Sequence, residues 1–570
     1  MIRKGVGITA HRRQRVADLS TRIGLALLSA ALLVASLPSP DIGSLGWVAL
    51  VPLLLAMQGL RPGQAASLGL LTGVFASFGI YGWLFEVPSF DLRHAVVLAL
   101  YVGAYPAIWA WATAWALRQR IPLIVCAPVF WLLIDYLRAH AGFLALPWGT
   151  LAQTQHHNLP LLQAAGVIGE HGVTFLVALG NAALAAFCLR QERRFAAATL
   201  LILITVHAWG VTELFSSTSG RSITVTAVQP NIQIGDRTTE AGRDVNLTRL
   251  ERLTREAASS HPDLIVWPES AIPGDLSDPS LISRLQRLSR ETGVPLILGA
   301  AQVEKFATGD SLLTIGRRAF NTAHLFQPSG STSPPYRKRM LVPFAEYLPH
   351  ADVIPWPEWL APRVTELTAG DNGQLFTLAP QISVGALICW ENLFSDLARE
   401  SVNSGAQLLV QLTNDVWFGQ TAAPKQHNLM SVMRAVETRT PVVIASNTGP
   451  SQVIDGYGRV VVTTSGSFLE STTAGVVALG GGGTVYSRTG DWFVLLTPLV
   501  AILGHFLLTR LSHVGHQRWT LFDWLRTRPR TVPVSSMTGR SRSAVRRTTP
   551  EVTGGDILPR HCIGTKEGTS

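Results

Sequence analysis

Cys389 is the residue of this sequence best placed to act as a nucleophile. The 570-residue chain has four cysteines, and only Cys389 lies within the segment 213–488. It ends the apolar run Val384–Ile388, and Trp390-Glu391 leads into a helical pattern. Sites collect at strand ends in α/β folds, and a helix start lowers the pKa of a thiol. A buried structural thiol is the alternative.

A nucleophilic thiol needs a proton acceptor, and the histidines of this segment share no motif with Cys389. Carboxylate and ammonium groups are better candidates: Glu269 closes the run 263–269, and Lys338 is followed eight residues later by Glu346. A carboxylate can take the thiol proton. A fixed ammonium can stabilise a thiolate and a tetrahedral oxyanion. Each is more often a surface charge on its own, but together they supply what acyl transfer requires.

The segment around these residues has the alternating pattern of an α/β domain. Short apolar or β-branched runs predict buried strands at 223–228, 264–267, 295–298, 382–389, 408–413 and 442–446. Runs with helical spacing and charged faces predict helices at 239–259, 281–292, 393–404 and 427–440. About 260 residues can build one such domain with its own core.

The rest of the chain is apolar enough to lie in a membrane, since 47% of all residues are hydrophobic and only 15% are charged. Eight apolar runs approach the ~20 residues that a membrane-spanning helix needs. They lie at 20–38, 44–60, 64–85, 94–117, 121–137, 160–189, 195–212 and 490–510. We interpret the first run as an uncleaved anchor rather than a signal peptide, because further spans follow it directly.

The distribution of charge predicts the topology and argues against nucleic-acid binding. The net charge is +10, yet 212–488 holds 22 Lys and Arg against 25 Asp and Glu. The positive excess lies at the chain ends and in alternate loops, as the positive-inside rule requires of cytoplasmic segments. No basic and aromatic surface pattern accompanies it.

We therefore predict five regions. They are a basic cytoplasmic N-terminus (1–19), seven transmembrane helices (20–212), an extracytoplasmic catalytic domain (213–488), an eighth helix (489–511) and a basic, disordered cytoplasmic tail (512–570).

The candidate residues carry a family resemblance. Trp267-Pro-Glu269-Ser, Lys338 with Glu346, and Ile388-Cys389-Trp390-Glu391 resemble the Glu-Lys-Cys set of the nitrilase, or carbon–nitrogen hydrolase, superfamily. Leu341–Pro349 and Thr413–Gly419 narrow the resemblance to the apolipoprotein N-acyltransferase family, over about 20–510. The resemblance implies an αββα sandwich joined to a polytopic α-helical membrane domain.

The resemblance also implies a mechanism and its partners. Cys389 would take an acyl chain from a membrane phospholipid as a thioester and pass it to the α-amine of a diacylglyceryl-cysteine on an apolipoprotein. Glu269 would be the base and Lys338 the oxyanion partner. Glu346, Glu391 and Trp390 would support them, or the two carboxylates would instead be structural caps. We expect a monomer in a bacterial inner or plasma membrane, without nucleic acid, and no cofactor.

Five residues are candidates for binding lipid or peptide. They are Trp148, Asn231, Trp417, Trp356 and Trp359. Trp148 is either an interfacial anchor or the wall of a lipid cavity. Trp356 and Trp359 belong either to a lid that dips into the interface, where Trp is favoured, or to an ordinary packed loop. The pair His156-His157 lacks further ligands at metal-site spacing, so we interpret it as surface and expect no metal site.

Two other functions are open at this point. A membrane-tethered amidase acting on a small carbon–nitrogen substrate would use the same Glu269, Lys338 and Cys389. A transporter or scaffold would carry polar residues within the membrane, for which Glu170-His171 is the clearest pair. The complete triad disfavours a domain that only binds. The many apolar runs favour lipid substrates.

Overall fold

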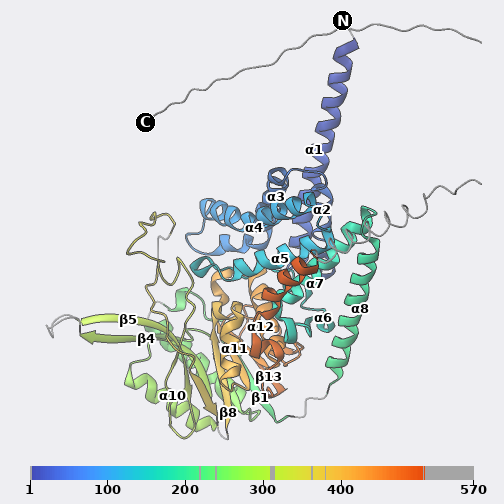
Figure 1. The fold of residues 1–570 in the computed structure, drawn as a ribbon. Helices are drawn as coiled ribbons and strands as arrows, with labels where there is room; N and C mark the ends of the chain where they lie inside the picture. Colours follow the sequence, from blue (N-terminus) through green and yellow to red (C-terminus); the bar gives the residue numbers. More distant parts are fainter. Residues whose placement is uncertain are drawn as a thin grey trace, which may run out of the picture. The chain divides into compact units, whose positions relative to one another are not determined.

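The computed structural model describes residues 3–216, 220–237, 240–307, 315–360, 364–378, 381–504 and 506. The predicted tail, residues 512–570, lies outside these ranges. The chain divides into a membrane half up to α8 and an α/β half that begins at β1 (Figure 1).

The membrane half consists of apolar helices joined by short 3-10 turns. The helices are α1 (Arg3–Ala35), α2 (Val51–Ala56), α3 (Pro62–Ile80), α4 (Leu92–Arg118), α5 (Leu123–Ala139), α6 (Leu159–Leu162), α7 (Ala165–Cys188) and α8 (Arg193–Phe215). The turns are η1 (Gly43–Trp47), η2 (Gly82–Glu86), η3 (Gly142–Leu144) and η4 (Gln153–Gln155).

Fewer helices than predicted are long enough to cross a membrane. The described residues contain five: 18–35, 62–80, 92–118, 165–188 and 193–215. The predicted spans 44–60, 121–137 and 490–510 correspond to shorter elements, namely η1 with α2, the 17-residue α5, and the helix 492–504. The count of eight is therefore not confirmed. An apolar run alone does not distinguish a short buried helix from a span.

The α/β half is built on two sheets. The first has the order β13-β1-β2-β4-β5-β6, with β3 beside β4, and the second has the order β12-β11-β10-β9-β8-β7. The first uses β1 (Ser222–Gln229), β2 (Leu264–Val266), β3 (Ile272–Asp275), β4 (Leu296–Ala307), β5 (Ile315–Phe326), β6 (Tyr336–Arg337) and β13 (Ser471–Ala478). The second uses β7 (Leu375–Leu378), β8 (Ile382–Ile388), β9 (Leu408–Thr413), β10 (Val442–Ser446), β11 (Gln452–Ile454) and β12 (Val460–Thr463).

The two sheets pack face to face and are covered by helices, so the predicted αββα sandwich is confirmed. Apolar side chains from both sheets form one buried core between them. The outer face of the first sheet packs against α9 (Glu240–Ala258) and α10 (Pro279–Thr292). The second sheet packs against α11 (Ser395–Asn403) and α12 (Ala423–Thr438), which lie side by side (Figure 1).

Helix α12 also joins the sandwich to the membrane half. One continuous apolar core includes Leu53 and Val177 from membrane helices together with Met433 and Val436 of α12. A residue on α12 therefore has the second sheet on one side and membrane helices on the other. This explains why nearly every side chain of α12 is buried.

A buried ion cluster lies at this junction. The guanidinium of Arg434 on α12 contacts Glu170 of α7 at 2.7 Å and Glu437 at 2.8 Å. Glu437 also accepts the backbone N–H of Glu170 at 2.8 Å, near Gly169, where the helical backbone of α7 is interrupted. Arg434 donates further to the carbonyls of Asn392 and Leu393, just after Cys389. The cluster thus connects a membrane helix to the chain segment that carries the candidate nucleophile.

We expect Arg434→Leu to destabilise the fold by about 3–5 kcal/mol, because it leaves two buried carboxylates without their cation. Thermal unfolding in detergent measures the effect. Arg252→Leu is the matched control: Arg252 pairs with Glu256 on α9, and both side chains are about half exposed, so its loss costs less than about 1 kcal/mol. Equal shifts of the two variants would contradict a special role for the buried cluster.

Candidate active site

The three predicted catalytic residues meet at one end of the sandwich. Glu269 follows β2, Cys389 follows β8, and Lys338 follows β6. The carboxyl ends of parallel strands meet at one edge, where sites form in α/β folds. Gly299 of β4 lets the Glu269 segment approach, because a Cβ there would lie 2.7 Å from the Cα of Glu269.

Cys389 occupies a sharp turn between β8 and the 3-10 helix η6 (Cys389–Leu393). Its φ of 51° lies in the left-handed region, which costs on the order of 1–3 kcal/mol for a residue with a side chain. Two side chains hold the turn: Gln411 Nε2 donates to the Cys389 carbonyl oxygen at 2.8 Å, and His427 Nε2 lies 3.2 Å from the same atom. The backbone at the nucleophile is therefore fixed by its neighbours.

Lys338 is the centre of the charged groups. Its ammonium lies 2.8 Å from Glu346 Oε1 and 3.6 Å from Glu269 Oε1, and its side chain is fully buried. Glu346 is held in turn by the backbone N–H of Val342, which donates to Oε2 at 2.7 Å. Asn321 Nδ2 donates to Glu269 Oε1 at 2.7 Å. One buried cation thus bridges two carboxylates, and each carboxylate has a second donor.

The surroundings assign different protonation states to these groups. Burial alone would lower the pKa of Lys338, but the charges of Glu346 and Glu269 raise it overall, so Lys338 stays a cation. Burial and then the charge of Glu269 raise the pKa of the Cys389 thiol well above its usual range, although Lys338 opposes this. Burial also raises the pKa of Glu269, against Lys338 and hydrogen bonds that include one from Cys389. The Cys389 thiol is therefore neutral, and it lies beside the Glu269 carboxylate, whose raised pKa makes it a stronger base than an exposed carboxylate.

Glu391 links the Lys338 segment to the Cys389 turn. Its carboxylate accepts the backbone N–H groups of Ile388, Arg339 and Met340 at 2.8, 2.6 and 3.2 Å. It also accepts the hydroxyl of Tyr336 at 2.9 Å. These donors flank both Lys338 and Cys389. Glu391 is thus placed to position the two residues rather than to exchange protons with substrate.

Trp148 and Trp390 line the apolar side of the site. Trp148 is 2% exposed, donates from Nε1 to Gln426 at 2.8 Å and stacks on His427 with ring centroids 5.8 Å apart. Trp390 packs into the same aromatic cluster, which also contains Trp83. Trp148 is therefore a buried residue at the junction of the two halves.

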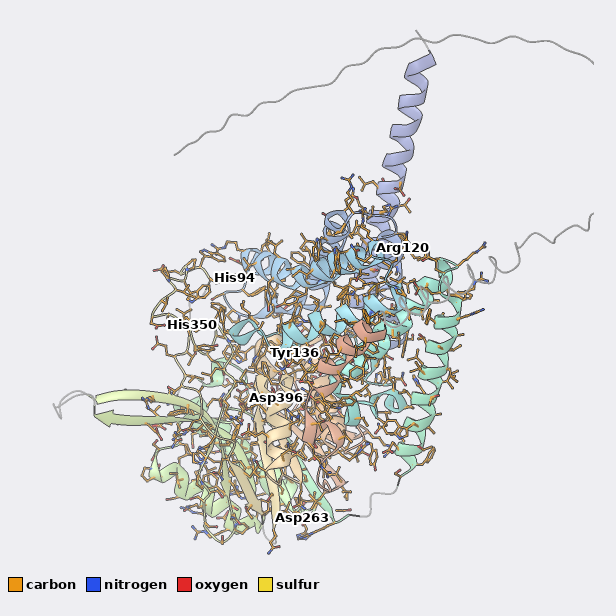
Figure 2. The ribbon with its side chains drawn as sticks, in the orientation of Figure 1. His94, Arg120, Tyr136, Asp263, His350 and Asp396 are labelled. Atoms are coloured by element: carbon orange, nitrogen blue, oxygen red, sulfur yellow. The ribbon has the colours of Figure 1, made fainter. Side chains whose placement is uncertain are left out.

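Trp356 and Trp359 lie against the membrane half. Trp356 packs edge-on against Phe344 and Phe143, the latter from η3. Trp359 is 36% exposed and lies 5.5 Å from the ring of His94, at the start of α4. His94 and His350 mark this side of the molecule in Figure 2. The loop 344–360 thus reaches the membrane helices. Both a lid and an ordinary packed loop would make these contacts, so the two predicted alternatives stay open.

The other two lipid-binding candidates have different surroundings. Asn231 donates from its side chain to the carbonyl of Phe468 at 2.9 Å, and its backbone N–H donates to Asn447. These contacts tie the end of β1 to two loops. Trp417, in η7 (Asp415–Phe418), is 42% exposed, whereas its neighbour Phe418 packs on Trp83. Neither contact set includes Glu269, Lys338 or Cys389.

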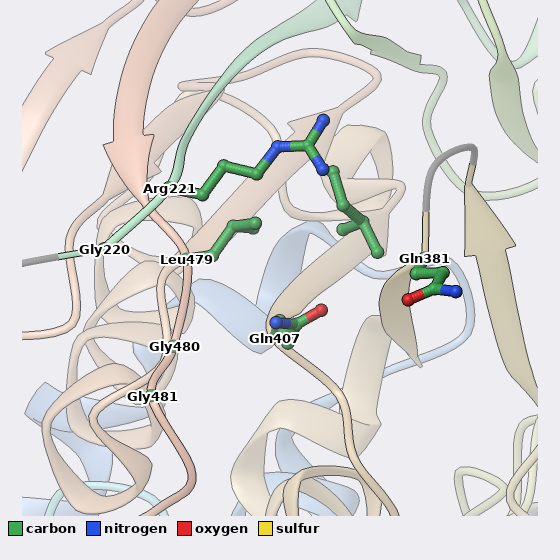
Figure 3. A pocket seen from close by; sticks show the side chains of 8 residues that line it. Gly220, Arg221, Gln381, Gln407, Leu479, Gly480 and Gly481 are labelled. Atoms are coloured by element: carbon green, nitrogen blue, oxygen red, sulfur yellow. The ribbon is translucent and has the colours of Figure 1, made fainter.

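A separate hollow of about 220 Å³ lies at the opposite end of β8 from Cys389. Figure 3 shows Arg221, Gln381 and Gln407 around it. It is also lined by Ile382, the first residue of β8, and by Gly480. Because Cys389 follows the last residue of the same strand, this hollow does not belong to the candidate active site.

Sequence reasoning missed several residues that complete the site. Asn321 lies on β5, a strand that was not predicted. His427 and Asp415, joined at 3.0 Å, were not connected to Cys389. His427 contacts the Cys389 backbone rather than its thiol, so it acts on the turn. No local pattern could reveal these contacts.

Comparison with known proteins places this arrangement in a class. Residues 224–478 match the carbon-nitrogen hydrolase family, and residues 29–183 match the apolipoprotein N-acyltransferase N-terminal domain. A solved nitrilase-superfamily structure, Saccharomyces cerevisiae Nit3, is 19% identical, with a TM-score of 0.35 over 46% of this chain and 92% of its own. The two family matches define an enzyme of the carbon–nitrogen hydrolase class joined to a membrane domain.

The relatives with the same organisation are more specific. The apolipoprotein N-acyltransferase of Geobacter metallireducens is 34% identical over 514 residues, which cover 86% of this chain and 96% of that protein. That of Gloeobacter violaceus is 31% identical over 517 residues, or 87% and 95%. The chain belongs to the apolipoprotein N-acyltransferase family, and it is a membrane acyltransferase.

We expect Glu391→Gln to cost more than about 2 kcal/mol of stability and to slow acyl-enzyme formation, because an amide cannot accept all the hydrogen bonds that the carboxylate receives. Tyr336→Phe removes only one of these donors and is the matched control, with an expected cost of about 1 kcal/mol. Thermal unfolding and single-turnover kinetics measure the two effects. A Gln variant no more impaired than the Phe variant would exclude the positioning role.

Proposed function

We propose that this protein transfers a fatty acyl chain from a membrane phospholipid, through a thioester on Cys389, to the α-amine of a diacylglyceryl-cysteine on an apolipoprotein. The proposal rests above all on Lys338, a fully buried cation shared by Glu269 and Glu346 beside Cys389. The two carboxylates alone compensate the buried charge of Lys338, so stability of the fold does not explain why a thiol lies beside this cation. It suits a site where negative charge develops during acyl transfer.

In the first half-reaction, Glu269 accepts the proton of the Cys389 thiol as the sulfur attacks the ester carbonyl of the phospholipid. Lys338 and the backbone N–H groups at the start of η6 stabilise the oxyanion. When the tetrahedral intermediate collapses, the C–O bond breaks. Glu269 then returns its proton to the leaving alkoxide, which departs as lysophospholipid. The thioester remains on the enzyme.

In the second half-reaction, the amine of the lipoprotein attacks the thioester carbonyl. Glu269 takes a proton from the attacking nitrogen, the C–S bond breaks, and Glu269 passes that proton to the departing sulfur of Cys389, which restores the thiol. The product is an amide. Lys338 again faces the oxyanion, so one set of groups serves both steps. Since its pKa is raised by two carboxylates, Lys338 keeps its charge throughout and cannot compete as a base.

The membrane half favours transfer over hydrolysis. Both proposed substrates are anchored in a bilayer, which raises the effective concentration of the amine at the site. The aromatic cluster of Trp83, Trp148 and Trp390 beside the Cys389 turn gives an apolar surface for the acyl chain and keeps water from the thioester. We place the segment 213–488 outside the cytoplasm and both chain ends inside, on the charge distribution of the loops.

We expect incubation with phospholipid alone to add one fatty acyl chain to Cys389, with release of lysophospholipid. Intact-protein mass spectrometry detects the adduct, and hydroxylamine removes it because it is a thioester. Cys389→Ala should fold and give no adduct, whereas Cys188→Ala, which removes an exposed thiol on α7, should behave as the wild type. A folded wild-type enzyme without an adduct would favour a tethered amidase, testable with small amides and nitriles.

We expect Glu269→Gln to slow thioester formation by at least ~10²-fold, as for the loss of a general base. Burial raises the pKa of Glu269, and only its ionised form accepts the thiol proton. The rate of the wild-type enzyme should therefore fall as the pH drops through this raised pKa, at a higher pH than for an exposed carboxylate. The Gln variant should lack this acid limb in single-turnover rates. If the Gln variant kept the same fall in rate at low pH, this fall would have to come from the titration of a group other than Glu269.

A further inference from the structure

Three possible metal ligands converge away from Cys389. Asp41 lies between α1 and η1, whereas His156 and His157 follow η4. Their ligand atoms all lie within 4.8 Å of one another. The sequence offers the histidine pair no further ligand at metal-site spacing, but the fold brings Asp41, more than a hundred residues away in the sequence, beside it.

His156 presents a nitrogen lone pair to the carboxylate. Its side chain is 8% exposed, and its Nδ1 lies 3.1 Å from the carbonyl oxygen of Gln153, an acceptor. The proton of a neutral ring therefore belongs on Nδ1, and Nε2 carries the lone pair. This Nε2 lies 3.2 Å from Asp41 Oδ1, a buried atom without a hydrogen-bond partner among the described residues. Two electron-rich atoms thus face each other.

His157 completes the group from the solvent side. Its Nε2 lies 3.3 Å from Asp41 Oδ2, and its side chain is 74% exposed. The rings of His156 and His157 are 3.9 Å apart. One face of the group is therefore enclosed, and the other is open to water molecules that could complete a coordination shell.

We propose that Asp41, His156 and His157 bind one divalent cation of the zinc class. Two imidazoles and a carboxylate are ligands that zinc prefers, at about 2.0–2.2 Å from the metal. The donor atoms of one tetrahedral ion lie roughly 3.3 Å apart. Here His156 Nε2 lies 3.2 Å from Asp41 Oδ1 and His157 Nε2 lies 3.3 Å from Asp41 Oδ2, and one ligand atom from each residue lies within 4.8 Å of the others. The hydrogen bond from His156 Nδ1 to a backbone carbonyl is the usual second contact of a metal-bound histidine.

The bound cation would fasten two loops that support the active site. Pro38, three residues before Asp41, accepts a hydrogen bond from Gln426 Nε2, and Gln426 precedes His427 at the Cys389 turn. Gln155 donates to the carbonyl of Gly43 at 2.9 Å. The contact between Gln155 and Gly43 already joins the two loops, so the metal adds a structural link rather than a catalytic group, and the site is independent of the proposed acyl transfer.

The test is zinc binding to the full-length protein, measured by equilibrium dialysis with ZnCl₂ and by thermal unfolding with and without the metal. We expect about one zinc ion per chain and a rise in the unfolding temperature, since the metal binds the folded state. The double variant Asp41→Asn/His157→Gln should bind at least tenfold more weakly and lose the rise. His261→Gln, which alters an exposed histidine of the α/β half, should keep both.

X-ray absorption of the zinc-loaded wild type provides a measurement that needs no variant. Two imidazole nitrogens and oxygen ligands in the metal shell would support the site. Sulfur ligands, a shell of oxygen alone, or equal binding by the double variant and the wild type would overturn the proposal. His513, His516 and His561 are present in the wild type and in both variants. Any zinc that they bind therefore contributes equally to all three proteins and does not affect the comparison.

Discussion

The site depends on one buried cation. Lys338 has no exposed surface and contacts two carboxylates, and burying an ammonium is costly unless it is paired. Glu346 is the nearer partner at 2.8 Å and is itself held by backbone. Glu269 is more distant at 3.6 Å, which suits its proposed role of exchanging protons while the charge of Lys338 remains compensated. In the proposed mechanism, this difference in distance distinguishes Glu346, which anchors the cation, from Glu269, which reacts.

The requirement to hold this cation explains much of the surrounding structure. Glu391 binds the backbone on both sides of the site, joining the segment that follows Lys338 to the end of the strand that precedes Cys389. Gln411 and His427 hold that turn from the other side. Because Cys389 has a left-handed backbone, these contacts offset a local conformational cost. Together they keep the thiol fixed relative to the base.

The membrane half is part of this support as well as a platform for lipid substrates. Arg434 connects Glu170 of α7 to the carbonyls that follow Cys389. Trp148, from the membrane half, stacks on His427. The pair Glu170-His171, which suggested a transport pathway, is buried in ion pairs with Arg434 and Asp135. Glu170 thus serves the junction between the two halves, whereas His171 pairs with Asp135 of α5 inside the membrane half.

The sequence by itself determined the local elements and the chemistry. The six predicted strands and four predicted helices correspond to elements of the structure. Each is a short apolar or amphipathic run, and the spacing of its apolar residues can be recognised from the sequence alone. Strands such as β5 and β13, with weaker patterns, were missed. Spacing and family resemblance identified Glu269, Lys338 and Cys389. Tertiary structure decided the rest, including the number of long apolar helices, the burial of Trp148 and the meeting of Asp41 with His156. Such contacts join residues far apart in the chain, and only the packing of elements brings them within reach of each other.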